Sequence, residues 1–143
     1  MFLRAGAFIL MPYFFDFDAT HRILRCRLEG RVTDEELKEF YRVSAEYVSH
    51  HPPRAAISDF SAVTAFDVSP ETVRELARSS PIMPDPELPR FVIAVSPKMF
   101  GMARMFELEG QSTRPNLHVV QSMEAACAIL GVEKPHFEPI AAE

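Results

Sequence analysis

The residues with the clearest chemical potential are two carboxylates and two hydroxyls near the middle of the chain. Asp59 and Ser61 follow a short apolar run, and Asp67 and Ser69 come just before Pro70. A serine followed by proline is typical of a helix start, where free backbone N–H groups and the helix dipole favour an anion. A phosphate on Ser69 would be stabilised by the helix end but repelled by Asp67. The same serine also has a purely structural interpretation, as the cap of that helix.

A second group of side chains has the composition of an apolar binding pocket. Methionine is flexible and polarisable, so it lines adaptable pockets as well as ordinary cores. The methionines at positions 99, 102 and 105 recur at helical spacing, with aromatic residues beside them. Core packing is one interpretation of this cluster. The other is a pocket under the proline-rich segment 80–90, lined by Phe60, Phe66, Met99, Met102 and Phe106.

Motifs for catalysis or metal binding are not found in the sequence. The chain lacks the G-x-S-x-G nucleophile motif, and its five glycines form no phosphate-binding loop. Its five histidines include the adjacent pair His50 and His51, but none stands in the paired ligand spacing of a structural zinc site. We therefore predict a protein that is not an enzyme and that holds no metal or cofactor. An enzyme of unrecognised type, the remaining alternative, would need a pocket with a strongly shifted titratable group.

Length and composition indicate one domain in a reducing compartment. The 143 residues are 48% hydrophobic, which is enough to bury a core. The net charge of −5 argues against a nucleic-acid partner, and no apolar stretch is long enough to span a membrane. Cys26 and Cys127 stand far apart among apolar neighbours, which is typical of buried free thiols. We predict a cytoplasmic protein.

The pattern of apolar residues predicts alternating strands and helices. Period-two alternation indicates a hairpin over residues 12–29 that ends at Gly30, and a capping box at 33–36 starts the clearest helix. The later segments are strands at 54–60, 91–95 and 117–120, and helices that start at Ser69, Ser96 and Ser122. The order β-β-α-β-α-β-α-β-α predicts an α/β fold with a mixed, mostly parallel sheet flanked by helices. We divide the chain into an N-terminal extension (1–11), one domain (12–132) and a C-terminal tail (133–143).

Several of these segments resemble motifs of the STAS domains, the anti-sigma-factor antagonist family, and within that family the SpoIIAA-like proteins. The family's strand ending D-L-S is similar to residues 59–61 (DFS), and its helix entry D-S-S-G is similar to residues 67–70 (DVSP). Residues 30–33 (GRVT) and 122–126 (SMEAA) resemble the entries of the family's first and last helices. The resemblance implies a STAS fold for residues 12–132. It also implies that Ser69 matches the serine that a partner kinase phosphorylates in antagonist members.

Two functions follow as hypotheses. The first is a non-enzymatic STAS-like signalling or interaction module that contacts a protein partner at the strand-to-helix junction 59–69, through Asp59, Ser61, Asp67 and Ser69. The alternative is a binder of an apolar or lipid-like small molecule in a pocket near the same junction. We also expect a homodimer, because the strand at 12–19 is predicted to lie at a sheet edge, where it can pair with a second copy.

Overall fold

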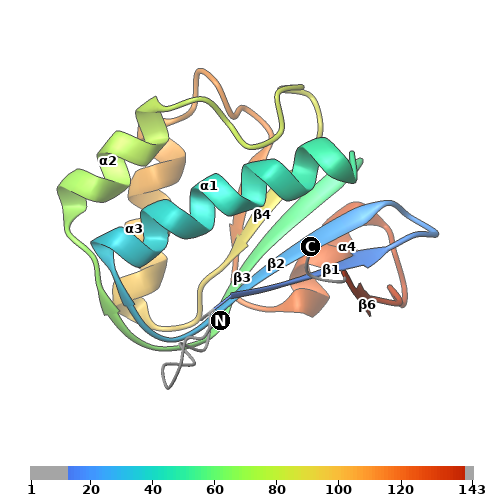
Figure 1. Cartoon of the computed structure of the whole chain (residues 1–143), viewed down its shortest axis with the longest axis horizontal. Helices are drawn as coiled ribbons and strands as arrows, with labels where there is room; N and C mark the ends of the chain where they lie inside the picture. The colour runs from blue at the N-terminus through green and yellow to red at the C-terminus, as the bar shows by residue number, and fades with distance from the viewer. Residues whose placement is uncertain (1–12, 141–143) are drawn as a thin grey trace, which may run out of the picture.

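The structure, a computed structural model that describes residues 13–140, is an α/β fold with a six-stranded mixed sheet and four helices (Figure 1). Its strands are β1 (Tyr13–Asp18), β2 (Ile23–Thr33), β3 (Ala55–Asp67), β4 (Arg90–Ile93), β5 (Leu117–Val120) and β6 (Glu138–Pro139). Its helices are α1 (Asp34–His50), α2 (Pro70–Arg78), α3 (Pro97–Glu109) and α4 (Met123–Leu130). The predicted α/β class is confirmed, and the first nine elements follow the predicted order. The N-terminal extension predicted at 1–11 lies outside the described residues.

The strands lie side by side in the order β5-β4-β3-β2-β1-β6. Strands β2, β3, β4 and β5 are parallel, while β1 is antiparallel to both of its neighbours. Each parallel pair is connected through one helix, and a right-handed connection is the near-universal solution for such a unit. The hairpin of β1 and β2 therefore extends a parallel β-α-β series at one side.

The helices cover the two faces of the sheet unequally. Helices α1, α2 and α3 lie on one face because their connections all move along the sheet in one direction, and α4 lies on the other face (Figure 1). On the first face, Leu24 and Leu28 of β2 pack with Phe40 of α1. On the opposite face, Ile57 of β3 packs with Ala126 of α4.

The helix ends follow local rules that the sequence already shows. Thr33 and Glu36 form the predicted capping box, in which the Thr33 amide donates to the Glu36 carboxylate at 3.0 Å. Ser96 and Ser122 cap α3 and α4 through their side-chain oxygens. Gly131 ends α4 in the left-handed conformation, with φ of 75°, which glycine adopts without a Cβ clash.

Two strands are longer than predicted. Gly30 was expected to end β2, but the strand continues to Thr33 with Gly30 at φ of 74°. Register shifts on both sides of Gly30 mark an irregular stretch of the ladder, where a glycine accommodates the positive φ without strain. Because β2 extends this far, β3 remains paired with it as far as Asp67 instead of ending near 60. The junction predicted at 59–69 is therefore mostly strand.

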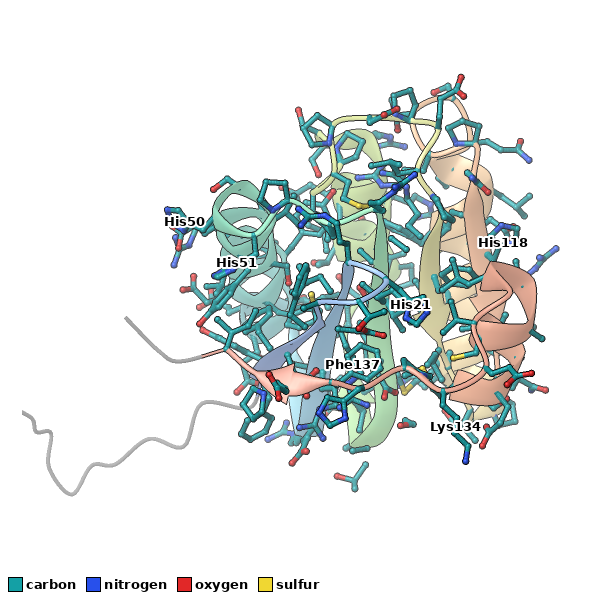
Figure 2. The ribbon with its side chains drawn as sticks, turned by 90° about the vertical axis from the view of Figure 1, so that its right-hand side faces the viewer. His21, His50, His51, His118, Lys134 and Phe137 are labelled. Carbon is teal, nitrogen blue, oxygen red and sulfur yellow. The ribbon has the colours of Figure 1, made fainter. Side chains whose placement is uncertain are left out.

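Strand β1, which was predicted to form an edge of the sheet, does not lie at the edge, because β6 pairs with its outer side. Residues 138–139, in the segment predicted as a tail, form β6 and pair with Asp16 and Phe17 of β1. The Ile140 amide also donates to the Phe15 carbonyl at 2.9 Å. Phe137 lies over the sheet just before this strand (Figure 2), with its ring 4.2 Å from the Arg25 guanidinium carbon. The returning tail covers the part of β1 that was expected to pair with a second copy.

Both cysteines are buried and free, as predicted. Burial raises the pKa of Cys26 to about 12 and raises the pKa of Cys127 as well, so both thiols are protonated at neutral pH. None of the described helices combines the length and the hydropathy that are needed to cross a membrane.

Candidate functional site

A cavity of about 110 Å³ lies between the sheet and helices α1, α2 and α3. Its wall is mostly apolar. The structure brings all five side chains of the predicted pocket around this one space: Phe60, Phe66, Met99, Met102 and Phe106. Other apolar side chains of the wall include Leu37, Phe40, Ala56, Val73, Leu76 and Ile82.

The periodicities of a strand and a helix explain how these side chains converge. Alternate residues of β3 point to the same face, so Ala56, Ser58 and Phe60 all face the three helices. On α3, the lining residues Met99, Met102 and Phe106 fall at spacings of three and four, which places them on one side of the helix. The same two periodicities therefore explain the apolar face of each element and the convergence of the predicted pocket residues.

The space between sheet and helices is not filled by side chains. Ser58 of β3 and Val92 of β4 lie on central strands and face the helices, yet both are only partly buried. Met102 and Phe106, which lie across from them on α3, are also only partly buried. Protein interiors normally pack to the density of organic crystals, so an accessible surface at this depth indicates room for a guest molecule.

Arg114 supplies charge to the wall of this cavity. It is 3% exposed and donates to the carbonyls of Leu76 at 3.2 Å, Ala77 at 2.8 Å and Ser79 at 3.1 Å. These carbonyls belong to the end of α2, where unpaired C=O groups and the negative end of the helix dipole favour a cation. Arg114 also donates to the Tyr41 hydroxyl of α1.

Arg90 is the second buried cation of the wall. It is 6% exposed and donates to the carbonyls of Met83, Asp85 and Leu88, so it organises the proline-rich segment 80–90. Burial lowers the pKa of Arg90, and the positive charge of Arg114 lowers it further. Within residues 13–140, every hydrogen-bond acceptor of these two guanidinium groups is a carbonyl or hydroxyl oxygen, never a carboxylate.

A buried hydroxyl completes the polar part of the wall. Ser44 of α1 lines the cavity and is 1% exposed. Within residues 13–140 its Oγ forms no hydrogen bond of normal geometry, and its contact with the Cys26 thiol offsets part of the rise that burial causes in the pKa of that thiol. A buried hydroxyl without a partner is costly, and such groups are rare unless water or a ligand satisfies them.

The arginines and Ser44 were missed from sequence, although one signal was present. Arg90 precedes Phe91 in the most strand-like segment and shares a face with Val92, which the period of two predicts to be buried. A charged residue on a buried face is a candidate for a specific role. Arg114 stands in a loop before β5, and nothing in its local sequence indicates burial.

The structure separates the four residues predicted at the junction into two places. Ser69 caps α2, accepting a hydrogen bond from the Thr72 amide at 3.2 Å. The Ser69 amide donates to Asp34 at 2.8 Å, and this hydrogen bond lowers the pKa of the Asp34 carboxyl. Asp67 is exposed and pairs with Arg31 at 2.6 Å. The starts of α1 and α2 are therefore linked through Asp34, which sequence reasoning did not identify.

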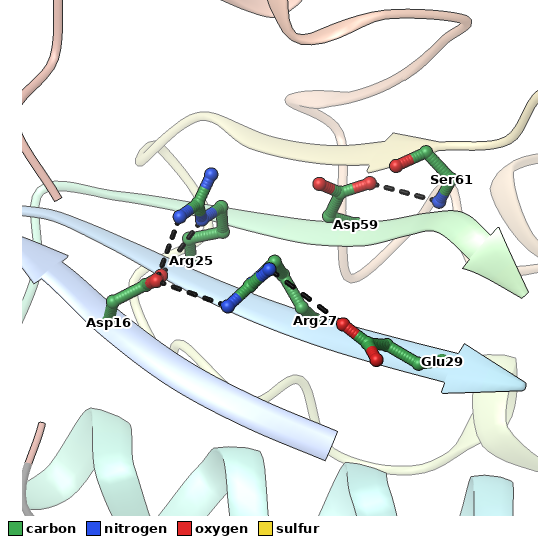
Figure 3. A network of polar contacts seen from close by, with 6 residues as sticks. All are labelled: Asp16, Arg25, Arg27, Glu29, Asp59 and Ser61. Atoms are coloured by element: carbon green, nitrogen blue, oxygen red, sulfur yellow. Dashed lines mark hydrogen bonds and ion pairs between the residues drawn. The ribbon is translucent and has the colours of Figure 1, made fainter. Parts of the chain in front are cut away.

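Asp59 and Ser61 lie elsewhere, on the sheet face opposite to helices α1, α2 and α3 (Figure 3). The Asp59 carboxylate accepts from the Ser61 amide at 3.0 Å. The same region of the sheet carries a chain of ion pairs in the order Arg25, Asp16, Arg27 and Glu29, in which Arg25 binds Asp16 with two contacts of 2.8 Å (Figure 3). The predicted partner-binding residues thus do not form one cluster.

The histidines are dispersed over the molecule. Figure 2 shows His50 and His51 at the end of α1, far from His118 of β5, with His21 between them. Among residues 13–140, no group of three or more His, Cys, Asp or Glu side chains is arranged to hold a metal ion.

Replacement of Ser69 tests its role as a cap. We expect Ser69→Ala to lower the free energy of unfolding by about 1 kcal/mol, because the Thr72 amide loses its acceptor. Ser61→Ala is the matched control, since Ser61 is exposed, and its effect should stay within about 0.5 kcal/mol. Urea denaturation of the two variants and the wild type makes the comparison. Equal stabilities of the two variants would contradict the capping role.

Comparisons with known proteins do not assign a family to this chain. No protein-family model matches it, and a search of curated proteins finds no match. The functional argument therefore depends on the geometry of the cavity and of the junction.

Proposed function

We propose that the protein binds a small apolar or amphipathic molecule in the cavity between the sheet and helices α1, α2 and α3. The observation that carries the proposal is an apolar wall, built from three helices and three strands, that leaves central strand residues partly exposed. Small-molecule sites are typically concave and apolar, with a few polar groups that set orientation. The polar groups here are Arg90, Arg114, Tyr41, Ser44 and Ser58.

The volume of the cavity limits the size of the ligand. An engineered cavity of about 150 Å³ in another protein binds benzene. At about 110 Å³, this cavity matches one ring or a short alkyl chain in the conformation described. Longer chains, an octyl chain included, require rearrangement of the flexible Met99 and Met102 side chains, which adapt at low cost. We therefore expect a ligand with a short or medium apolar part.

The chemistry of the wall supports binding without catalysis. The titratable group of the cavity with a resolved pKa shift is Arg90. Arginine keeps its charge in proteins, so it does not serve as a general acid or base near neutral pH. We therefore propose a binding protein and not an enzyme.

A cavity-filling substitution tests the proposed function. Ala103 of α3 lines the cavity and is buried, so Ala103→Leu should occupy the space that the ligand needs. We expect Ala103→Leu to weaken binding of 1-octanol at least about tenfold, while its unfolding free energy stays within about 1.5 kcal/mol of the wild type. Titration calorimetry measures the binding, and thermal denaturation measures the stability.

The matched control is Ala128→Leu, an identical change at an exposed position of α4. This variant should bind 1-octanol as the wild type does. Equal affinity of Ala103→Leu and Ala128→Leu would place the bound alcohol outside the cavity and contradict the proposal.

As a second candidate, we propose that the protein has a STAS-like arrangement and acts as a signalling or interaction module. The 59–69 segment would be its contact surface. The favouring observation is the outer edge of β3, since β4 pairs only with Ala56–Asp59. Beyond this point Ser61, Ala62 and Thr64 are exposed. An unpaired strand edge can add a strand from another chain, and a second copy would produce a homodimer here instead of at the strand 12–19.

A charge placed on this edge tests the second candidate. Thr64→Lys should disrupt pairing between copies, because lysine on an edge strand opposes strand addition. Light scattering at two protein concentrations should show a dimer for the wild type and for the control Thr20→Lys, which carries the same change at an exposed turn. Thr64→Lys should remain a monomer. A wild type that is monomeric at both concentrations would contradict the homodimer at this edge.

A further inference from the structure

We propose that the ligand of this cavity is an amphiphile with an anionic head group, a carboxylate or a phosphate, which Arg90 and Arg114 bind. The inference rests on the proposed function and adds the chemical class and orientation of the ligand. Three observations carry it: two buried cations, their position at one end of the cavity, and a buried hydroxyl at the same end that has no oxygen or nitrogen partner among the described residues.

Neither guanidinium group forms a hydrogen bond with a carboxylate in the described chain, although the charge of Asp85 acts on Arg90 from nearby. Backbone carbonyls satisfy their N–H groups, but carbonyl dipoles do not cancel a full charge as a carboxylate does. Burying an unpaired charge is expensive, and two buried like charges repel each other as well. The lowered pKa of Arg90, caused first by burial and then by Arg114, reflects this cost. An anion between them would relieve it.

Both arginines lie at the same end of the cavity. Arg90 begins β4, and Arg114 reaches the carbonyls at the end of α2, so both are near the amino ends of the parallel strands. The opposite end is apolar: Phe66 comes from the last part of β3, and Met99 from the first turn of α3. The cavity is therefore itself amphipathic, with charge at one end and hydrocarbon at the other.

Hydroxyl groups of α1 are at the charged end too. Helix α1 starts where β2 ends and runs back to the start of β3, so its later residues approach the amino ends of the strands. Tyr41 already accepts a hydrogen bond from Arg114, and its own hydroxyl donates to the Ser80 carbonyl at 2.7 Å. Ser44 lies one turn further along, buried and without an oxygen or nitrogen partner among the described residues. Its hydroxyl can donate to a head-group oxygen.

The ligand would therefore lie with its head between Arg90 and Arg114 and its chain toward Phe66 and Met99. Phe106 would lie beside the head, since its ring centroid is 4.9 Å from the Arg114 guanidinium carbon. Stacking on the ring fixes the plane of that guanidinium, so its positive charge is held in one position beside the head group.

Four probes that differ in head or chain test the inference on the full chain by titration calorimetry: octanoate, octyl phosphate, 1-octanol and inorganic phosphate. We expect octanoate or octyl phosphate to bind at least about tenfold more tightly than 1-octanol, because only the anions interact with the guanidinium charges. Inorganic phosphate should bind more weakly than octyl phosphate, because it lacks the apolar chain.

The possible outcomes distinguish the head-group inference from the proposed function. If 1-octanol binds as tightly as both anionic amphiphiles, the head-group inference is overturned and the proposed function stands. If inorganic phosphate equals octyl phosphate, the site is one for a free anion, and the amphiphile is excluded. If none of the four probes binds, the proposed function fails and the inference fails with it.

Variants assign the effect to the two arginines. Arg90→Met and Arg114→Met keep an apolar stem but remove the charge, so each should reduce the affinity for octanoate toward that for 1-octanol. Arg78→Met is the matched control, since Arg78 is exposed on α2, and it should leave both affinities unchanged. If the methionine variants do not fold, Arg90→Lys and Arg114→Lys replace them and should retain the preference for octanoate. Folded methionine variants that keep this preference would overturn the assignment.

Discussion

The buried guanidinium of Arg114 is the contact on which the arrangement of the helical face depends. It joins the loop before β5 to the last carbonyls of α2 and to Tyr41 of α1, three segments far apart in sequence. Gly110 permits this approach, because a Cβ at that position would lie 3.1 Å from Nη1 of Arg114 and 3.3 Å from the Ala77 carbonyl. Hydrogen bonds from a charged donor stabilise by about 1.5–3 kcal/mol each, which offsets part of the cost of burying the charge.

Small side chains explain why the helical face of the sheet, which Arg114 holds together, contains a cavity. Ala56 and Ser58 of β3 face Ala103 of α3 across the space, so neither surface projects far enough to fill it. The larger aromatic residues stand around the space; Phe60, for example, lies 6.2 Å from Phe66 between ring centroids. Because α2 is held at its end by Arg114, the helices do not collapse onto the small residues. The packing of the three helices therefore explains both the buried charge at one end of the cavity and the unfilled apolar space at the other end.

Local signals allowed much of the fold to be predicted. Capping serines at 69, 96 and 122 mark helix starts correctly, since a cap depends on residues a few positions apart. The five predicted pocket residues converge because strand and helix periods assign them to one side of each element. Their spacing alone did not separate a pocket from a solid core, because that difference depends on the size of residues on the facing element.

Features that depend on distant pairing were not predicted. The extension of β3 to Asp67 follows from the length of β2, and the two residues of β6 have no strand pattern without β1 beside them. The role of Arg114 could not be read from its neighbours, since all of its main partners come from other elements. Ser69 was recognised as a cap, but its link to Asp34 required the starts of α1 and α2 to meet.

The position of a bound amphiphile is the most direct test of this account. A crystal structure of the full chain grown with octanoate should show the alkyl chain between β3 and α3, with the carboxylate at Arg90 and Arg114. Side chains of Met102 and Phe106 that close the space, with octanoate absent from it or bound on the outer surface, would contradict the account.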